Sequence, residues 1–329
     1  TPLRPWTADI SIISPQNTCS IDNSILEKLE KNPIVNAAYG RMFSYDVSTT
    51  VNDDRVTLDI ISYEQKQFDW AKNYLLQGSI KVVQNEVNTG MIVYSPENNI
   101  EVGDTVNCRI GEKPIEIKIA GILSDCPFNT TSNGILICSE NTFQKITGQN
   151  KYTIIDIQLD KNATDTDVNA LHQMIGNDFT FSDERMGNES TRGIYYCMCL
   201  FLYGFLVIVA LITIFNIINS IALSVAARTK QYGAFRAIGV STKQLTKMII
   251  AEAATYTIIG TVIGSILGVA FHKLLFGMMI TYNWGDTWKI PLNELGIIIA
   301  IMFFSIIIAV YRPVKRLRKM SITENISAQ

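Results

Sequence analysis

Residues that could carry chemistry are sparse in the first 190 positions of the sequence. His172 is the only histidine there, and on an expected surface helix a histidine is far more often structural than catalytic or metal-binding. Asp53-Asp54 and Asp165-Thr166-Asp167 lack the EF-hand spacing and suit turns or helix caps better than calcium. Nucleophile-elbow, zinc-protease and SxxK motifs are absent, and no basic and aromatic stripe indicates nucleic acid. We therefore predict no catalytic, metal-binding or cofactor-binding residue, and a binding or force-transmitting role for this region.

The cysteines do not define a metal site either. They are Cys19, Cys108, Cys126, Cys138, Cys197 and Cys199. No CxxC pair occurs, which disfavours zinc. The first four allow three disulfide pairings, and their spacing is as compatible with buried thiols as with a single disulfide.

A basic connector, residues 228–245, lies between two long apolar segments. Phe235 and Ile238 are apolar, framed by Gly233 and Gly239 and flanked by cations. This pattern predicts a short amphipathic helix, bounded by turns, that docks into a groove on another protein. The cations would also suit a connector that only sets membrane topology or rests on anionic lipid headgroups. The connector alone leaves both interpretations open.

Charge divides the chain near residue 192. Residues 1–192 carry 16 Lys and Arg against 26 Asp and Glu, whereas residues 193–329 carry 12 against 4. The acidic part is polar, and the basic part holds nearly all the long apolar runs. We predict two domains, an α+β extracytoplasmic domain at 1–190 and an all-α transmembrane domain at 191–329.

Three membrane spans are expected, at about 193–227, 248–275 and 292–311, with a cytoplasmic connector at 228–247 and a cytoplasmic tail at 312–329. The first has 35 residues without a charge, which as a helix would extend about 52 Å at roughly 1.5 Å per residue. A bilayer core needs about 20 residues, so the surplus predicts either a rigid stalk above the membrane or a tilted helix that begins with a loop.

Several residues within the spans are expected to pack against other helices. Polar residues share one face near the end of the first span: Asn216, Asn219, Ser220 and Ser224. Small residues form a GxxxGxxxG ridge in the second span: Gly260, Gly264 and Gly268. Polar groups facing lipid are costly and glycine ridges permit close backbone approach, so both sets predict helix packing, within one subunit or between two. For Glu252, pairing with a connector cation is favoured over proton coupling.

Orientation follows from the positive-inside rule. Residues 228–247, the whole cytoplasmic connector, hold five Lys and Arg and no acidic residue. The tail at 312–329 holds five Lys and Arg and one acidic residue, Glu324. The loop at 277–291 has only two charged residues, Asp286 and Lys289. It also contains Tyr282, Trp284 and Trp288, which are predicted to form an aromatic belt at the membrane interface. Connector and tail are therefore predicted to be cytoplasmic, and residues 1–190 extracytoplasmic. Because no export signal precedes Thr1, we expect at least one further transmembrane helix upstream.

The extracytoplasmic domain shows short alternating strand and helix patterns. Helices are predicted at 24–31, 64–76, 139–146 and 164–175, and strands at 55–62, 134–138 and 152–159. The clearest element is a hairpin, with strands at 105–110 and 115–122 around a turn at 111–113.

The stretch NIINSIALSVAARTKQYGAFRAIGVSTKQLTKMIIAEA, residues 216–253, resembles the FtsX-like permease domain of ABC transporters, of the MacB type. The correspondence covers the N-I-I-N helix end, the R-T-K run, the G-x-x-R-A-I-G turn and the E-A of the next helix. It continues more loosely to Arg312-Pro313, and residues 102–123 are similar to the β-rich part of that family's extracytoplasmic domains.

The resemblance implies a core of four helices, three of them present here, and a second permease subunit or second half of the same permease. It also implies a separate P-loop ATPase that binds ATP and Mg²⁺, and the chain itself has no Gly-Lys dipeptide and hence no P-loop. The residues expected to couple to the ATPase are Tyr232, Gly233, Phe235, Arg236, Ile238 and Gly239.

The first hypothesis is therefore a mechanotransmitting permease subunit, not itself an enzyme, in the bacterial cell membrane. It would use ATP hydrolysis by its partner to move the extracytoplasmic domain and export or extract an amphiphilic peptide, antibiotic or lipoprotein. The alternative is an ATP-driven regulator of a cell-wall hydrolase that transports nothing. A membrane-anchored receptor without an ATPase is a third interpretation, and membrane lipid is a contact in all three.

Overall fold

The computed structural model describes residues 7–52, 54–109, 114–130 and 132–319. The chain divides into two compact units. The N-terminal unit comprises Thr1–Tyr196 and Met278–Thr287, and the helical unit comprises Cys197–Gly277 and Trp288–Gln329. The first is a mixed α+β structure and the second is helical, as the composition predicts.

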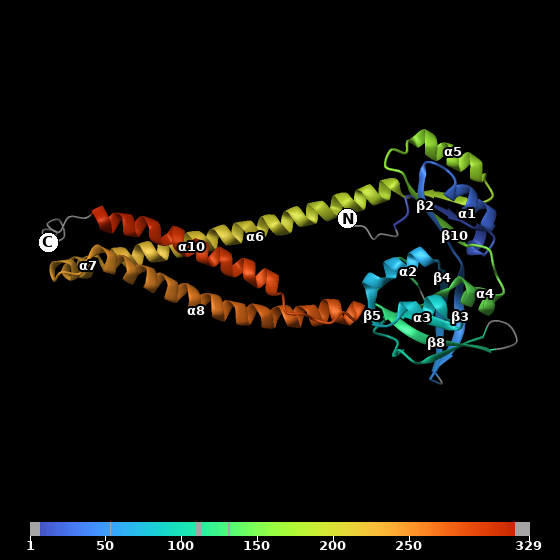
Figure 1. Ribbon diagram of the computed structural model, residues 1–329, viewed down its shortest axis with the longest axis horizontal. Helices are drawn as coiled ribbons and strands as arrows, with labels where there is room; N and C mark the ends of the chain where they lie inside the picture. The colour runs from blue at the N-terminus through green and yellow to red at the C-terminus, as the bar shows by residue number, and fades with distance from the viewer. Residues whose placement is uncertain (1–6, 53, 110–113, 131, 320–329) are drawn as a thin grey trace. The chain divides into compact units, whose positions relative to one another are not determined.

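Two sheets form the N-terminal unit (Figure 1). The smaller is antiparallel with strand order β11-β1-β10-β2, and the larger is mixed with order β5-β8-β6-β9-β4-β3-β7. The strands are β1 (Ile10–Ile13), β2 (Val35–Arg41), β3 (Phe43–Val51), β4 (Asp54–Tyr63), β5 (Leu75–Gly78), β6 (Thr89–Val93), β7 (Thr105–Arg109), β8 (Pro114–Leu123), β9 (Gly134–Ser139), β10 (Ile154–Leu159) and β11 (Thr180–Asp183).

The larger sheet closes on itself. β7 pairs with β3 on one side and with β8 on the other, so six strands form a ring and β5 is added at the outer end of β8. Inward residues of the ring, such as Leu58, Ile117 and Leu136, are fully buried in the main hydrophobic cluster. Closure removes most of the open sheet edge, which is one way a β-rich domain avoids edge pairing.

Short helices cover the sheets: α1 (Asn23–Glu30), α2 (Gln65–Ala71), α3 (Ile80–Asn85), α4 (Glu140–Thr147) and α5 (Asp165–Ile175), with 3₁₀ turns η1 (Pro15–Asn17) and η2 (Lys72–Tyr74). α1 packs on β2, and α3 packs on β6, β8 and β9 (Figure 1). The Asp22 carboxylate accepts from the Ser24 N–H at 3.1 Å and caps α1, while Ser139 caps α4. These local signals are the ones that define helix starts in the sequence.

The hairpin of β7 and β8 and the other expected strands are confirmed, although its turn at 111–113 lies outside the described residues. The helix expected at 64–76 is wrong in its second half. α2 ends at Ala71, and Leu75 and Leu76 lie in β5, which pairs with β8. Pairing with a distant strand overrides the local helical pattern here.

The helical unit contains the three long apolar helices. They are α6 (Arg185–Ala227), which starts in the N-terminal unit, α8 (Thr242–Phe276) and α10 (Leu292–Lys319). By length and hydropathy, one segment in each is suitable for crossing a membrane. α6 is one continuous helix of 43 residues, about 64 Å at 1.5 Å per residue, so the first span does not begin with a loop.

The helix boundaries near the connector differ from those expected. α7 spans Thr229–Ala237, so Gly233 lies inside it rather than at its start. α10 continues past residue 311 through Pro313 to Lys319. Proline deprives one carbonyl of its hydrogen bond, a cost of about 3 kcal/mol, and Ile306 and Val310 just before it are packed in the bundle and favour continuation.

The loop between α8 and α10 contains a π-helical turn η3 (Gly277–Thr281) and a one-turn helix α9 (Tyr282–Trp284). Gly285 ends α9 in the left-handed conformation, at φ +71°.

Candidate functional site

The connector between α6 and α8 consists of the short helix α7 and one tight turn. α7 follows α6 after Arg228, which occupies the N-cap position without a side-chain capping hydrogen bond. Gly239, at φ +98°, reverses the chain, a conformation that residues with a side chain rarely adopt. Ser241 and Gln244 then form a capping box at the start of α8, with the Ser241 N–H donating to Gln244 Oε1 at 2.9 Å.

Tyr232 anchors α7 to the bundle. Its side chain is 2% exposed and lies in a cluster with Val225 of α6, Leu245 and Ile249 of α8, and residues of α10. Its hydroxyl is buried without a hydrogen-bond partner among the described residues. Burial, with the Glu252 carboxylate nearby, raises the pKa of Tyr232. Tyr232, predicted as a coupling residue, therefore supports the connector from within.

A polar cluster joins the end of α6, the first residue of the connector, and α8. Arg228 Nη1 lies 3.2 Å from Glu252 Oε1, and Ser224 Oγ donates to the same carboxylate oxygen at 3.1 Å. The predicted pairing of Glu252 with a connector cation is confirmed. It links the end of α6 to α8 at the first residue of the connector.

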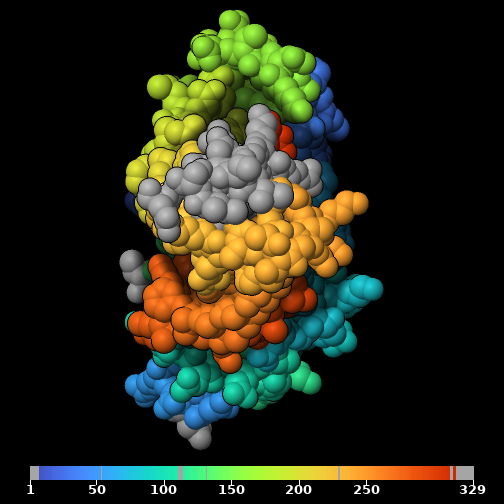
Figure 2. Space-filling view, turned by 90° about the vertical axis from the view of Figure 1, so that its left-hand side faces the viewer, coloured from blue at the N-terminus to red at the C-terminus, as the bar shows by residue number. Residues whose placement is uncertain are grey.

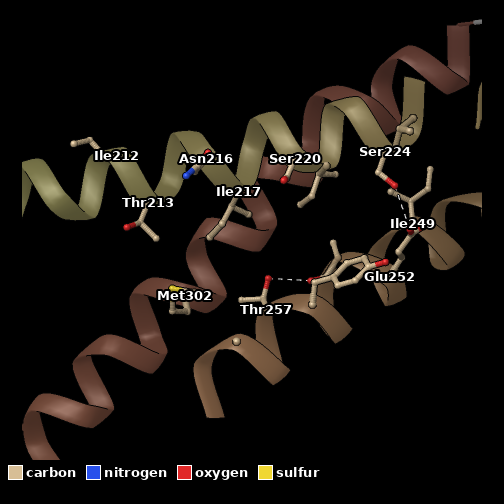
Figure 3. Close-up of a pocket in the computed structure, with 15 residues that line it drawn as sticks. Ile212, Thr213, Asn216, Ile217, Ser220, Ser224, Ile249, Glu252, Thr257 and Met302 are labelled. Atoms are coloured by element: carbon tan, nitrogen blue, oxygen red, sulfur yellow. Dashed lines mark hydrogen bonds between the residues drawn. The ribbon is translucent and has the colours of Figure 1, made fainter. Parts of the chain in front are cut away.

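A cavity of about 680 Å³ lies between α6, α8 and α10, and Ser224 and Glu252 of this cluster are part of its lining (Figure 3). Asn216, Ser220 and Ser224 line it from α6, opposite Glu252 and Thr257 of α8. Asn219 does not line the cavity, and Asn216 and Ser220 are exposed, so packing of this polar face against another helix stays a prediction.

The opposite side of α7 is open. Ile238 is 78% exposed and Phe235 is 39% exposed, although both are apolar. Gly233 and Arg236 are half-buried, and Gly239 is exposed. Figure 2 shows this end of the helical unit, with the residues around α7 in yellow-orange at its surface. α7 therefore has one side built into the chain and one apolar side exposed.

The glycine ridge faces open space in this chain. A Cβ built on Gly260, Gly264 or Gly268 has no neighbouring atom within 4 Å among the described residues. Packing of this ridge against a second subunit stays a prediction.

The N-terminal unit shows structural uses for its candidate residues. His172 stacks on Phe181 at 4.5 Å between ring centroids, and Asp167 forms a capping box with Thr164. Asp53 lies outside the described residues. Among the described residues, no group of three or more His, Cys, Asp or Glu is arranged to hold a metal ion.

The cysteine question is answered for this structure, because none of the six, all within the described residues, is in a disulfide. Burial raises the pKa of the Cys108 thiol to about 12 and also raises the pKa of Cys138. Both are therefore unreactive core thiols.

The helical unit can be compared with known protein families. Residues 203–322 match the family of the FtsX-like permease C-terminal domain. The helical unit is therefore similar to an FtsX-like permease domain. The matched residues include α7, its anchor Tyr232 and the Arg228–Glu252 pair, so the connector lies within the region that resembles this family.

Relatives are distant. An uncharacterized ABC transporter permease of Methanocaldococcus jannaschii is 20% identical over 248 residues, which is 71% of this chain and 59% of the relative. The chain thus spans a little under two thirds of that protein's length.

Solved structures similar to part of this chain include the periplasmic region of MacB from Actinobacillus actinomycetemcomitans. It is 16% identical with a TM-score of 0.42, covering 57% of this chain and 94% of that one. The extracellular domain of the ABC-type transporter YknZ from Gram-positive bacteria is 11% identical with a TM-score of 0.37, covering 50% and 87%.

The match to this permease family and the three helices that are long and apolar enough to cross a membrane fit a multi-pass protein of the cytoplasmic membrane with an extracytoplasmic segment.

Proposed function

We propose that this chain is the permease subunit of an ABC transporter that transmits ATP hydrolysis by a separate ATPase to its N-terminal unit. The work done there is export or extraction of an amphiphilic cargo such as a peptide, an antibiotic or a lipoprotein. ATP and Mg²⁺ bind the ATPase, and α7 is the element that the ATPase moves.

The observation that carries the proposal is the two-sided connector. Tyr232 and the Arg228–Glu252 pair fix α7 to α6 and α8, so a push on α7 reaches the inner ends of two spans. Ile238 and Phe235 offer an apolar surface beside the turn at Gly239. An exposed apolar patch on a short helix fits insertion into a groove of a partner protein.

Ile238→Asp tests the docking. Burying the new carboxylate in an apolar groove costs several kcal/mol, and each 1.4 kcal/mol weakens binding about tenfold. We expect the variant to insert into membranes normally but to lose most co-purification with its ATPase, and with it ATP-dependent function. Val87→Asp is the matched control, because Val87 is an exposed apolar residue of the N-terminal unit at 49% exposure.

Full co-purification and activity of the Ile238→Asp variant would refute the proposal. Deletion of the gene separates the two uses of the coupling. Sensitivity to a toxic peptide indicates export, and a cell-separation defect indicates regulation of a cell-wall hydrolase.

A further inference from the structure

The segment Met278–Thr287 belongs to the N-terminal unit, although in sequence it lies between α8 and α10. We call it the strap. The Gly285 N–H donates to the Thr281 carbonyl at 2.9 Å, and Thr281 Oγ1 donates to the Asp286 carbonyl at 2.8 Å. The strap is therefore a closed turn held by its own hydrogen bonds.

Gly285 brings the strap backbone directly onto two side chains. A Cβ at this position would lie 2.7 Å from Leu76 Cδ1 and 2.9 Å from Tyr94 Cδ2. Real Cβ atoms do not approach other atoms this closely. Together with φ +71°, the contact requires glycine for two independent reasons.

The receiving side is built for this contact. β5 is the end strand of its sheet, and its pairing register with β8 shifts between Leu75 and Gln77, so Leu76 is the bulged residue. A bulge redirects a side chain that regular pairing would place elsewhere. Leu76 and Tyr94 also pack against the main hydrophobic cluster, and the Tyr94 N–H donates to the Leu123 carbonyl at 2.8 Å.

We infer that the strap is a docking element that seats the α8–α10 loop in the notch between Leu76 and Tyr94. The N-terminal unit is then tied to the permease domain twice, once through α6 and once through the strap. A displacement of the permease domain would then reach the N-terminal unit through both connections. This role in transmission rests on the proposed function, whereas the docking itself does not.

The competing use of the strap is membrane contact alone, since Tyr282 and Trp284 are exposed aromatics of the kind found at lipid interfaces. In that case the conformation of the strap would depend on lipid and would not depend on contacts with β5. Docking predicts that a substitution in β5 changes the conformation of the strap, whereas membrane contact alone predicts no change.

Leu76→Ala and Leu75→Ala, in the full chain in lipid nanodiscs, provide that test. Both leucines are half-buried in β5, but Leu75 packs against the second hydrophobic cluster and not at the notch. We expect hydrogen exchange of residues 278–287 to accelerate at least about tenfold in Leu76→Ala and to stay unchanged in Leu75→Ala. No acceleration, or equal acceleration in both, would overturn the docking.

Gly285→Val is a second and independent variant, with Gly148→Val as its control. Both glycines have φ +71°, but nothing lies within 4 Å of a Cβ built on Gly148. The backbone strain is therefore matched and only the clash with the notch differs. Faster exchange of the strap in Gly285→Val alone supports docking, and slow exchange in Gly285→Val overturns it.

The transmission role has its own readout, the change in hydrogen exchange across β1 to β11 when the partner ATPase is trapped with ATP and vanadate. We expect Leu76→Ala to reduce this change and Leu75→Ala to preserve it. A full response in Leu76→Ala, with the strap released, overturns transmission through the strap. No response in the unmodified chain refutes the proposed function and this role together, while the exchange of the strap still tests the docking.

Discussion

Two arginine–carboxylate pairs, one in each unit, are built differently. In the N-terminal unit, Arg41 and Asp156 pair with side chains only 2% and 8% exposed, and Ser11 Oγ donates to Asp156 at 2.7 Å. In the helical unit, Arg228 and Glu252 pair with side chains 49% and 20% exposed. The first joins β2 to β10 inside a closed core, and the second joins two helices at a surface.

The difference follows from how each unit completes its packing. The N-terminal unit buries its own apolar residues, and Arg41 also lies 4.6 Å from the centre of the Phe128 ring. In the helical unit, burial is concentrated at the inner end around Tyr232, while most apolar residues of α6 and α8 are exposed. Buried pairs are rigid and costly to break, whereas half-exposed pairs exchange readily with water. The N-terminal unit is thus suited to move as one body, whereas the Arg228–Glu252 pair at the connector is the more loosely held of the two pairs.

The largest expected effect is at the buried pair. Asp156→Ala leaves the Arg41 guanidinium buried without its carboxylate, which costs about 3–5 kcal/mol of unfolding free energy. We expect calorimetry of the full chain to show a strongly lowered transition for the N-terminal unit and an unchanged one for the helical unit. A loss below about 1 kcal/mol would show that the two pairs are equivalent, which would remove the contrast.

The second largest expected effect is the change in stability of the N-terminal unit with pH. Burial raises the pKa of Glu64 to about 7, despite the Gly40 N–H that donates to it at 2.5 Å, and burial also raises the pKa of Glu140. A carboxyl with a raised pKa favours the folded state while protonated, so this stabilisation is complete below about pH 4.5 and disappears as the pH rises through 7.

We expect Glu64→Gln to reduce the loss of stability between pH 4.5 and pH 7 by about 1–2 kcal/mol, a value discounted for the partial exposure of Glu64. The measurement is the thermal transition of the N-terminal unit as a function of pH. Gln65→Glu, which places a carboxyl at the exposed neighbouring position, is the control. An identical pH profile in Glu64→Gln and the unmodified chain would contradict the prediction.

What the sequence predicts correctly in this fold is local. The starts of α1, α4 and α5 and the alternation of β7 and β8 depend on neighbouring residues. Each of these helices starts within one residue of the predicted position, after a cap at Asp22, Ser139 or Thr164. The pairing of Glu252 was also predictable, because a lone acid at the same membrane depth as a cationic connector has few other partners.

What the sequence could not give depends on distant contacts. Leu75 and Leu76 read as helix until β8 is placed beside them, and closure of the ring requires β7 to meet both β3 and β8. Tyr232 could not be assigned as an anchor, since only the packing of α6, α8 and α10 buries it. The notch that receives Gly285 is likewise formed by residues far from it in sequence.

The smallest expected effect is at the half-exposed pair. Arg228→Gln removes one partner but leaves Glu252 within reach of water and of Ser224 Oγ, so the unfolding free energy of the helical unit should fall by no more than about 1 kcal/mol. Lys230→Gln removes an exposed cation from the same connector and is the matched control for charge. A double-mutant cycle with Glu252→Gln isolates the pair itself. A coupling energy above about 2 kcal/mol would mean that the Arg228–Glu252 pair is held as tightly as the buried Arg41–Asp156 pair, which would remove the contrast between the two units.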